Sequence, residues 1–323
     1  MFPAGLSMLW EHGTDPVQAL RDRFGFDHPE ALGTWLRPIL ASHWSLQVHD
    51  YERVLLSDHN ALIWARTHRG DVVVKICASE THFEHLAAVT GIVADLATAG
   101  VPVAAPSPSR EGEVRVVART SELPLSLSVA PVVSGAFLDM ADIDGAHAAG
   151  AALAQLHRAA AHLDHALPDE PRGGEPALRT RLGLAEQDPA RPKAPRACAE
   201  LDGLLATLPD LDGAVQVVHN DYRGANVLMQ GSQVAAILDF DEMRIDHPVC
   251  DLGRATVLMA TRFTTWDPTP PPVQQALVQG YAAVLPLSDL QRRWLRVVQL
   301  RLSIAHITHS AQPERWIEAT ESI

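Results

Sequence analysis

The stretch VVHNDYRGANVLM, residues 217–229, places a His, two Asn, an Asp and an Arg between two short apolar runs. A second stretch, VAAILDFDEMRIDHPVCDLGR at residues 234–254, repeats the arrangement, since an apolar run is followed abruptly by three acids. Apolar runs of this length are typical of buried strands, whereas polar clusters are typical of surface loops. The alternation therefore predicts polar side chains held at the ends of short, buried strands.

The segment that joins the two stretches, VLMQGSQVAAIL at residues 227–238, predicts a β-hairpin that turns at Gly231. Because a hairpin returns the end of its second strand to the start of its first, Asp239 is expected near Asn226 and Asp221. Two carboxylates and an amide oxygen make a hard-oxygen site suited to Mg²⁺ that also binds phosphate. A carboxylate that is not bound to the metal can accept the proton of a hydroxyl nucleophile. This set of groups is the one that phosphoryl transfer uses.

The composition narrows the class of protein. The chain has 323 residues, of which 47% are hydrophobic and 20% charged, as is typical of a soluble globular protein. Its net charge of −13 argues against a nucleic-acid partner and is compatible with a cationic substrate. Three scattered cysteines form no CxxC pair, so neither a disulfide framework nor structural zinc is expected. Without a signal-peptide pattern or a membrane-length apolar run, we expect a cytoplasmic protein with no membrane partner.

Patterns along the chain predict three regions. The first, residues 1–42, reads as an N-terminal helical extension with helices near residues 15–24 and 28–40. The second, residues 43–130, is a smaller, β-rich N-terminal lobe. Its expected elements are strands at residues 52–58, 60–68, 71–78, 113–120 and 124–133, and one main helix at 80–99. The third, residues 131–323, is a larger, mostly helical lobe whose first long helix is Ala-rich, at 145–163. A loop rich in Pro, Gly and charge is expected at residues 167–176.

These elements give an α+β class with a small antiparallel β lobe and a larger, mostly helical lobe. The order of polar motifs then resembles the aminoglycoside phosphotransferase and choline kinase-like family of small-molecule kinases, which includes the type II homoserine kinases. The family pattern is H-x-D-x-x-x-x-N, an apolar strand, I-D-[FW]-[DE] and D-x-x-x-D-[LI]. Here it is matched by HNDYRGANVL, AILDFDE and DHPVCDLGRA. Further matches are ALAQLHRA at 152–159, VVVKI at 72–76 and AGVPVAAP at 99–106. The resemblance implies a bilobal protein-kinase-like fold with ligand bound in the cleft between the lobes. It makes residues 43–130 the nucleotide-binding lobe and residues 131–323 the catalytic and substrate lobe.

By the same resemblance, Asp221 is the catalytic base that positions and deprotonates the acceptor hydroxyl. Asn226 and Asp239 are the expected Mg²⁺ ligands. The implied cofactors are ATP, with GTP as the alternative, and Mg²⁺.

The N-terminal lobe has its own implied nucleotide-binding residues. Lys75, the only lysine of this lobe, matches the lysine that contacts the α- and β-phosphates, and Glu84 is its expected partner on the following helix, in preference to Glu80. LLSDHNALIWA at residues 55–65 has no glycine, unlike the Gly-rich loop of protein kinases. Ser57 and Asn60 are therefore the candidates to cover the phosphates.

Other polar residues near the motifs leave alternatives open. Arg223 either reaches the transferring phosphoryl group or pairs with a surface acid. Asp241 either touches a second metal or lines the cleft, and with Glu242 and Asp246 it is expected near the catalytic mouth.

Four further residues have expected structural roles. By the resemblance, His219 braces its loop by hydrogen bonding and Asp251 anchors that loop. His306 and His309 lie one helical turn apart, but no third ligand accompanies them, so core or surface positions are expected instead of a metal site.

The function that follows is an ATP- and Mg²⁺-dependent kinase that phosphorylates a hydroxyl of a small polar, aminated molecule: an amino sugar, an aminoglycoside or another antibiotic. The alternative acceptor is a metabolite such as homoserine or an amino alcohol, because residues 261–288 resemble the C-terminal helices of type II homoserine kinases. A non-catalytic pseudokinase is disfavoured because Lys75, Asp221, Asn226 and Asp239 are all present. A protein kinase is disfavoured by the missing Gly-rich loop and the lack of an A-P-E segment.

Overall fold

A computed structural model describes residues 5–11, 13–163, 167–168, 178–211, 213 and 215–322. The chain divides into two compact units. The N-terminal unit comprises residues 1–98 and 103–133, and the C-terminal unit comprises residues 99–102 and 134–323.

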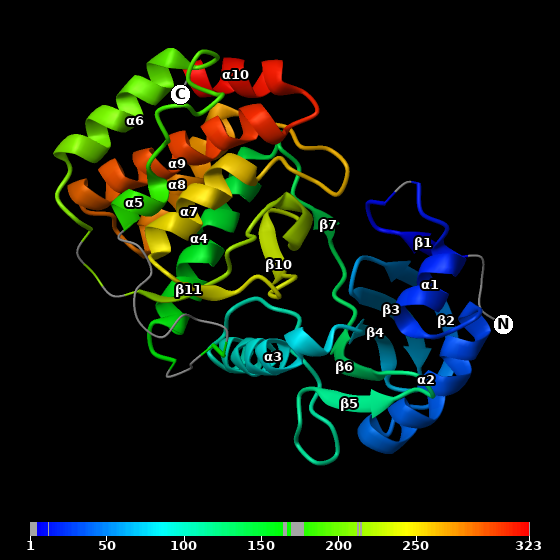
Figure 1. The fold of residues 1–323 in the computed structure, drawn as a ribbon. Helices are drawn as coiled ribbons and strands as arrows, with labels where there is room; N and C mark the ends of the chain where they lie inside the picture. Colours follow the sequence, from blue (N-terminus) through cyan, green and yellow to red (C-terminus); the bar gives the residue numbers. More distant parts are fainter. Residues whose placement is uncertain are drawn as a thin grey trace. The chain divides into compact units, whose positions relative to one another are not determined.

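The N-terminal unit is built on a six-stranded sheet with the strand order β1-β2-β3-β4-β6-β5 (Figure 1). Its strands are β1 (Leu6–Met8), β2 (Val48–Leu56), β3 (Asn60–Thr67), β4 (Gly70–Cys77), β5 (Val116–Arg119) and β6 (Pro124–Pro131). All pairs are antiparallel except β1 with β2. The predicted antiparallel meander is thus confirmed, whereas β1 was not predicted, because three residues are too short for a periodic signal.

Four helical elements accompany this sheet: α1 (Pro16–Phe24), α2 (Pro29–Trp44), the 3₁₀ turn η1 (Glu80–His82) and α3 (Phe83–Thr98). Proline at the first helical position begins both α1 and α2, as predicted for α1. Their buried side chains, among them Leu20, Phe24 and Leu36, join Ile63 and Val74 of the sheet in one apolar core. The two helices of the first 42 residues therefore share their core with the sheet instead of standing apart from it.

The C-terminal unit is mostly helical, and the predicted α+β class is confirmed (Figure 1). Its helices are α4 (Ile143–Ala160), α5 (Leu178–Leu182), α6 (Pro195–Thr207), α7 (Pro248–Leu258), α8 (Pro271–Val284), α9 (Asp289–His309) and α10 (Pro313–Ser322). Its short strands are β7 (Ala136–Phe137), β8 (Gln216–Val218), β9 (Val227–Gln230), β10 (Gln233–Ile237) and β11 (Arg244–Asp246), with the 3₁₀ turn η2 (Gly224–Asn226) before β9. The loop predicted at residues 167–176 lies largely outside the described residues.

Helices α4 and α8 approach each other closely because each carries a glycine at the contact. A Cβ on Gly150 would lie 1.9 Å from the carbonyl oxygen of Leu277, and a Cβ on Gly280 would lie 1.8 Å from that of His147. Only a residue without a side chain fits at such distances. This packing fixes α4, whose last turns carry a histidine of the candidate site.

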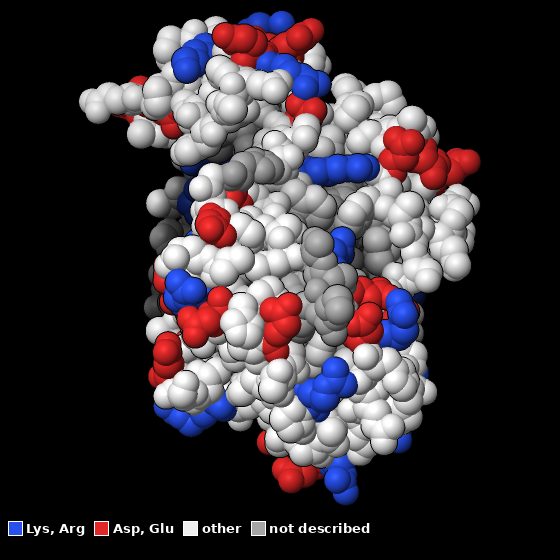
Figure 2. Space-filling view, turned by 90° about the vertical axis from the view of Figure 1, so that its right-hand side faces the viewer, with Lys and Arg blue, Asp and Glu red and all other residues white. Residues whose placement is uncertain are grey.

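The predicted hairpin is confirmed. β9 and β10 pair in an antiparallel register from Gln230–Gln233 to Val227–Ile237, and Gly231 in the turn has a φ of 59°. Within the described residues, no helix has both the length and the apolar content that a membrane crossing needs. On the face shown in Figure 2, acidic and basic side chains are interspersed in small groups over a mostly uncharged surface.

Candidate functional site

The loop at residues 219–226, between β8 and β9, is anchored through its backbone by one buried carboxylate. Asp251, in the first turn of α7, accepts hydrogen bonds from the backbone N–H groups of His219 and Asn220, both at 2.9 Å. These bonds hold Asn220 in the left-handed region, with a φ of 64°, which Asn tolerates better than most residues. The anchoring role predicted for Asp251 is confirmed.

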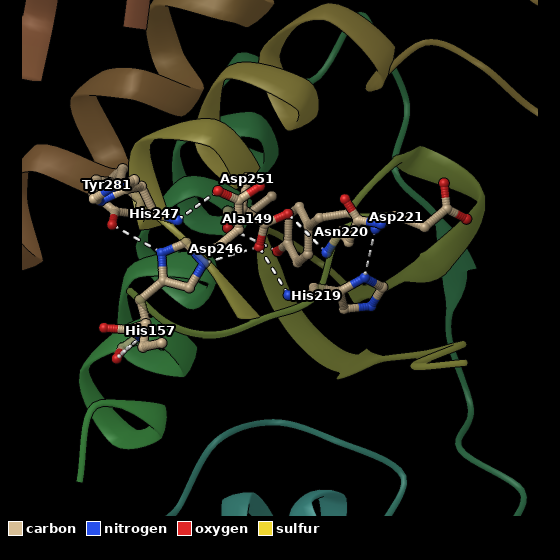
Figure 3. A network of polar contacts seen from close by, with 11 residues as sticks. Ala149, His157, His219, Asn220, Asp221, Asp246, His247, Asp251 and Tyr281 are labelled. Atoms are coloured by element: carbon tan, nitrogen blue, oxygen red, sulfur yellow. Dashed lines mark hydrogen bonds and ion pairs between the residues drawn. The ribbon is translucent and has the colours of Figure 1, made fainter. Parts of the chain in front are cut away.

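A histidine and a tyrosine complete the surroundings of this carboxylate (Figure 3). His157 of α4 donates from Nε2 to Asp251 Oδ2 at 2.9 Å, and its Nδ1 lies 2.8 Å from the hydroxyl of Tyr281 on α8. Because an ionised carboxylate only accepts hydrogen bonds, Nε2 of His157 carries the proton of the contact with Asp251. Burial works to raise the pKa of Asp251, but the hydrogen bonds from His157 and His219 outweigh it, so the pKa lies below its ordinary value. The anchor is therefore charged at neutral pH.

The imidazole of His219 braces the loop, as predicted. It is fully buried, and its Nε2 donates to the carbonyl of Leu238 at 2.9 Å. Its Nδ1 accepts from the backbone N–H of Asp221 at 3.2 Å. With both ring nitrogens committed, His219 joins the loop to the end of the hairpin and has no nitrogen left for proton transfer.

The carboxylate of Asp221 is held through one of its two oxygens. Oδ2 accepts from Arg223 Nε at 3.0 Å and from Asn226 Nδ2 at 2.9 Å. Among the residues that the structure describes, none donates a hydrogen bond to Oδ1. The side chain points away from the Asp251 network in Figure 3 and is 18% exposed. One oxygen is thus fixed and the other is available to a ligand.

The hairpin brings Asp239 back to this loop. The N–H of Leu238 donates to the carbonyl of Asn226 at 2.8 Å, and Asp239 follows directly with a φ of 58°. A positive φ is uncommon for a residue with a side chain, although Asp is among the residues enriched there. The structure therefore places Asn226, just before β9, beside Leu238, which lies just after β10 and directly precedes Asp239, as the hairpin argument predicted.

The chemistry of this donor set fits a magnesium ion that is coordinated both by protein oxygens and by phosphate oxygens. Asn226 is buried and uses Nδ2 to bond Asp221, so its side-chain carbonyl oxygen is the atom that would bind a metal. The carboxylate of Asp239 would supply the second hard oxygen. Within the described ranges, no group of three or more His, Cys, Asp or Glu could hold a metal by itself. Two protein oxygens plus phosphate oxygens and water is the usual arrangement for Mg²⁺.

The N-terminal unit places Lys75 on β4, between Leu62 of β3 and Ser128 of β6. Val72 and Val74 are buried on the opposite face, as the alternation predicted. Arg115, just before β5, lies on the same side as Lys75, since it donates to Ser128 Oγ at 3.2 Å and to Ser126 Oγ at 2.7 Å. Sequence patterns did not indicate this second cation, because it lies outside every motif.

The predicted phosphate-covering turn is short and ordered by its own backbone. The N–H of Ser57 donates to the carbonyl of Asn60 at 2.8 Å, and Ser57 Oγ lies 3.3 Å from the same oxygen. Glu84 is exposed in the first turn of α3. The nucleotide roles of these residues and of Lys75 remain predictions.

Arg223 pairs with an acid of its own loop, and its contact with the transferring phosphoryl group stays a prediction. It binds Asp221 itself, and its guanidinium carbon lies 5.7 Å from the ring centroid of Trp266. Its Nη1 is buried and has no hydrogen-bond partner among the described residues. The expectation of a surface acid is wrong because the loop folds Arg223 back over its own aspartate, two residues earlier.

Asp246 lies away from the expected catalytic mouth, which corrects the sequence prediction. Antiparallel pairing of β11 with β8 sets Asp246 opposite Gln216, at the end of β8 farther from the 219–226 loop. There Asp246 is buried and forms a 2.5 Å ion pair with Arg181. Asp241 is half-buried and Glu242 is exposed in the turn between β10 and β11, so these two acids stay candidates for substrate contact.

His306 and His309 have structural positions, as expected. The ring of His306 is stacked between Trp266 and Trp316, with centroid distances of 5.9 and 4.6 Å. Its Nδ1 lies 2.8 Å from the carbonyl of Leu302, and Nδ1 of His309 lies 2.7 Å from that of Ala305. Each histidine thus bonds its own helix.

Comparison with known proteins supplies the family. A sequence model described as the phosphotransferase enzyme family, APH, matches residues 53–294, which is well over half of the chain. The chain belongs to this phosphotransferase family. It is therefore a kinase that acts on a small molecule, and the predicted family is confirmed. No curated protein sequence matches the chain.

Solved structures of three proteins described as kinases or phosphotransferases show the same fold. A microcompartment-associated aminopropanol kinase is 19% identical, with 89% of this chain and 93% of that chain covered and a TM-score of 0.60. The amicoumacin kinase hAmiN, solved with AMP-PNP, Ca²⁺ and Ami, is 16% identical over 94% and 96%, with a TM-score of 0.58. The macrolide 2′-phosphotransferase MphH from Brachybacterium faecium is 21% identical over 89% and 97%, with a TM-score of 0.55. At these identities the likeness establishes the protein-kinase-like fold and leaves the acceptor open.

Proposed function

We propose that this phosphotransferase moves the γ-phosphate of ATP, with Mg²⁺, to a hydroxyl of a small polar molecule, and that Asp221 is the general base. The observation that carries the proposal is that only one oxygen of the Asp221 carboxylate accepts hydrogen bonds from its neighbours. Arg223 and Asn226 fix Oδ2 at 3.0 and 2.9 Å, and Oδ1 is left to meet the acceptor. An oxygen at a fixed position is what a general base needs before the acceptor binds.

In the proposed reaction, Oδ1 of Asp221 takes the hydroxyl proton as the acceptor oxygen bonds to the γ-phosphorus. The bond between the γ-phosphorus and its bridging oxygen breaks, and ADP leaves with that electron pair. Asn226 and Asp239 would hold Mg²⁺, which when bound neutralises charge on the β- and γ-phosphate oxygens. Lys75 contacts the α- and β-phosphates, with Glu84 as its partner, and the turn of Ser57 and Asn60 covers them.

For the acceptor we propose an aminated molecule. Asp241 and Glu242 follow the metal-binding hairpin directly, and the chain carries an excess of 13 negative charges. Fixed acids beside a hydroxyl site favour a cationic acceptor through Coulomb attraction. The named relatives act on amicoumacin, a macrolide and aminopropanol. They support an amino sugar or other aminated antibiotic first, and an amino alcohol or homoserine as the alternative.

A screen for acceptor-dependent ADP release tests the proposal. Purified protein with Mg²⁺-ATP is assayed against aminoglycosides, amino sugars, other aminated antibiotics, homoserine and choline. We expect at least one aminated compound to raise ADP release well above the rate without acceptor, with a phosphomonoester as product. Binding of Mg²⁺-ATP without turnover of any hydroxyl compound would favour the non-catalytic alternative.

A further inference from the structure

The turn formed by residues 57–60 is attached to a part of the chain that precedes the family match. That match begins at residue 53, whereas β1 covers Leu6–Met8. β1 pairs in parallel with the last residues of β2, and the N–H of Leu9 donates to the carbonyl of Leu56 at 2.8 Å. Residues 6–9 therefore run along β2 up to the start of the turn.

Arg23, at the end of α1, connects this N-terminal segment to the turn. Its Nη1 donates to the carbonyl of Ser57 at 3.0 Å. Its two terminal nitrogens also donate to both carboxylate oxygens of Glu11, at 3.0 and 2.6 Å. Arg23 Nη1 lies 3.9 Å from Oδ1 of Asp58, which belongs to the turn. A two-point guanidinium–carboxylate pair is stronger and more directional than a single contact.

The position of this guanidinium is itself fixed. Leu20 and Phe24, which flank Arg23 on α1, are buried in the core of the N-terminal unit. The Arg23 and Glu11 side chains are only 26% and 19% exposed, so solvent screens the pair less than it screens a surface pair. The hydrogen bond from Arg23 lowers the pKa of Glu11 to about 2, which keeps the carboxylate charged across the physiological range. Near neutral pH both groups of the Arg23–Glu11 pair are therefore charged. This pair, together with the hydrogen bond from Arg23 to the Ser57 carbonyl, is called the clamp below.

We propose that Arg23 is a positioning residue for nucleotide binding, and that this clamp is what the N-terminal segment contributes to the enzyme. The inference rests on the proposed function, in which Ser57 and Asn60 cover the phosphates. A Gly-rich loop loses conformational freedom when it closes over a nucleotide. The turn here has no glycine and is held from α1 through the Ser57 carbonyl, so less freedom is lost on binding.

The test compares variants of two ion pairs on the same hairpin. Arg23→Ala removes the clamp. Arg66→Ala removes the pair that Arg66, near the end of β3 farther from the turn, forms with Glu52 in the middle of β2. Each is titrated with a fluorescent Mg²⁺-ATP analogue, and kcat and KM are measured with saturating acceptor. For Arg23→Ala we expect the nucleotide Kd and KM to rise about three- to tenfold, the size of a partly screened ion pair. The kcat at saturating nucleotide should stay unchanged, and Arg66→Ala should behave as wild type.

Two further variants separate positioning from folding. Arg23→Lys keeps one donor to the Ser57 carbonyl but not the two-point pair, so it should restore part of the affinity. Glu11→Gln keeps the shape of the pair without its charge, and a smaller rise in Kd is expected. The inference is overturned if folded Arg23→Ala and Glu11→Gln bind nucleotide as wild type does, or if Arg66→Ala weakens binding equally. Failure of the wild-type chain to bind Mg²⁺-ATP would instead refute the proposed function.

Discussion

Replacement of Asp221 by Asn is the substitution whose outcome the site geometry determines most closely. Oδ2 receives two donors, Arg223 Nε at 3.0 Å and Asn226 Nδ2 at 2.9 Å. An asparagine at this position satisfies both donors only if its carbonyl oxygen takes the place of Oδ2. Its NH₂ group then occupies the place of Oδ1, where it presents protons to the acceptor and cannot remove one. The loop keeps its hydrogen bonds while the base is lost.

The expected effect is the whole contribution of a general base, a fall in kcat of about 10²–10⁴-fold. This corresponds to about 3–5 kcal/mol of transition-state stabilisation. KM for the nucleotide should change little, because Asp221 is not a proposed metal ligand. The assay is coupled ADP release at saturating ATP and acceptor, with a melting curve to show that the variant is folded.

Asp202→Asn is the matched control, since Asp202 forms an exposed ion pair with Arg191, away from the loop. It should retain the wild-type kcat. A folded Asp221→Asn variant that loses less than tenfold in kcat would refute the assignment of the base.

Three predictions concern stability. Asp251→Asn leaves a buried anchor without its charge and should cost about 3 kcal/mol in the free energy of unfolding, as measured by urea denaturation. Gly280→Ala forces a Cβ to within 1.8 Å of the His147 carbonyl oxygen. The free energy of unfolding should therefore fall by on the order of 3 kcal/mol, measured by the same method. An unchanged urea midpoint would contradict the close helix contact. Burial lowers the pKa of His306 below its ordinary 6.5, so the unfolded chain binds more protons in acid and stability should fall as the pH drops from 7.5 to 5.5. His306→Phe should flatten that slope, and a slope identical to the wild type would exclude His306 as a source of it.

The sequence was sufficient to predict the parts of the site that follow from local pairing. The β9–β10 hairpin was predictable because Gly231 marks a two-residue turn between apolar strands, and the hairpin alone brings Asp239 beside Asn226. The burial of Val72 and Val74 on the face opposite Lys75 followed from strand alternation. Such features depend on short sequence separations and on a period of two.

Contacts between distant elements could not be predicted in this way. The contacts among His157, Asp251 and Tyr281 form only because α4, α7 and α8 pack together. The spacing of residues along the sequence does not predict that packing. The ion pair of Asp246 with Arg181 depends in the same way on tertiary packing. Arg223 differs, because it lies two residues from its partner, but several side-chain conformations are open to it and only the folded loop selects one.

The central claim is that Asp221 supplies the base and Asp239 the metal–nucleotide contact. Titration of Mg²⁺-ATP into Asp221→Asn and Asp239→Ala tests this division directly. Loss of a metal ligand leaves phosphate charge less neutralised, so Asp239→Ala should raise the nucleotide Kd by at least about tenfold. Asp221→Asn should bind the nucleotide with the wild-type Kd. Wild-type affinity in folded Asp239→Ala, or an equal loss of affinity in both variants, would contradict the account.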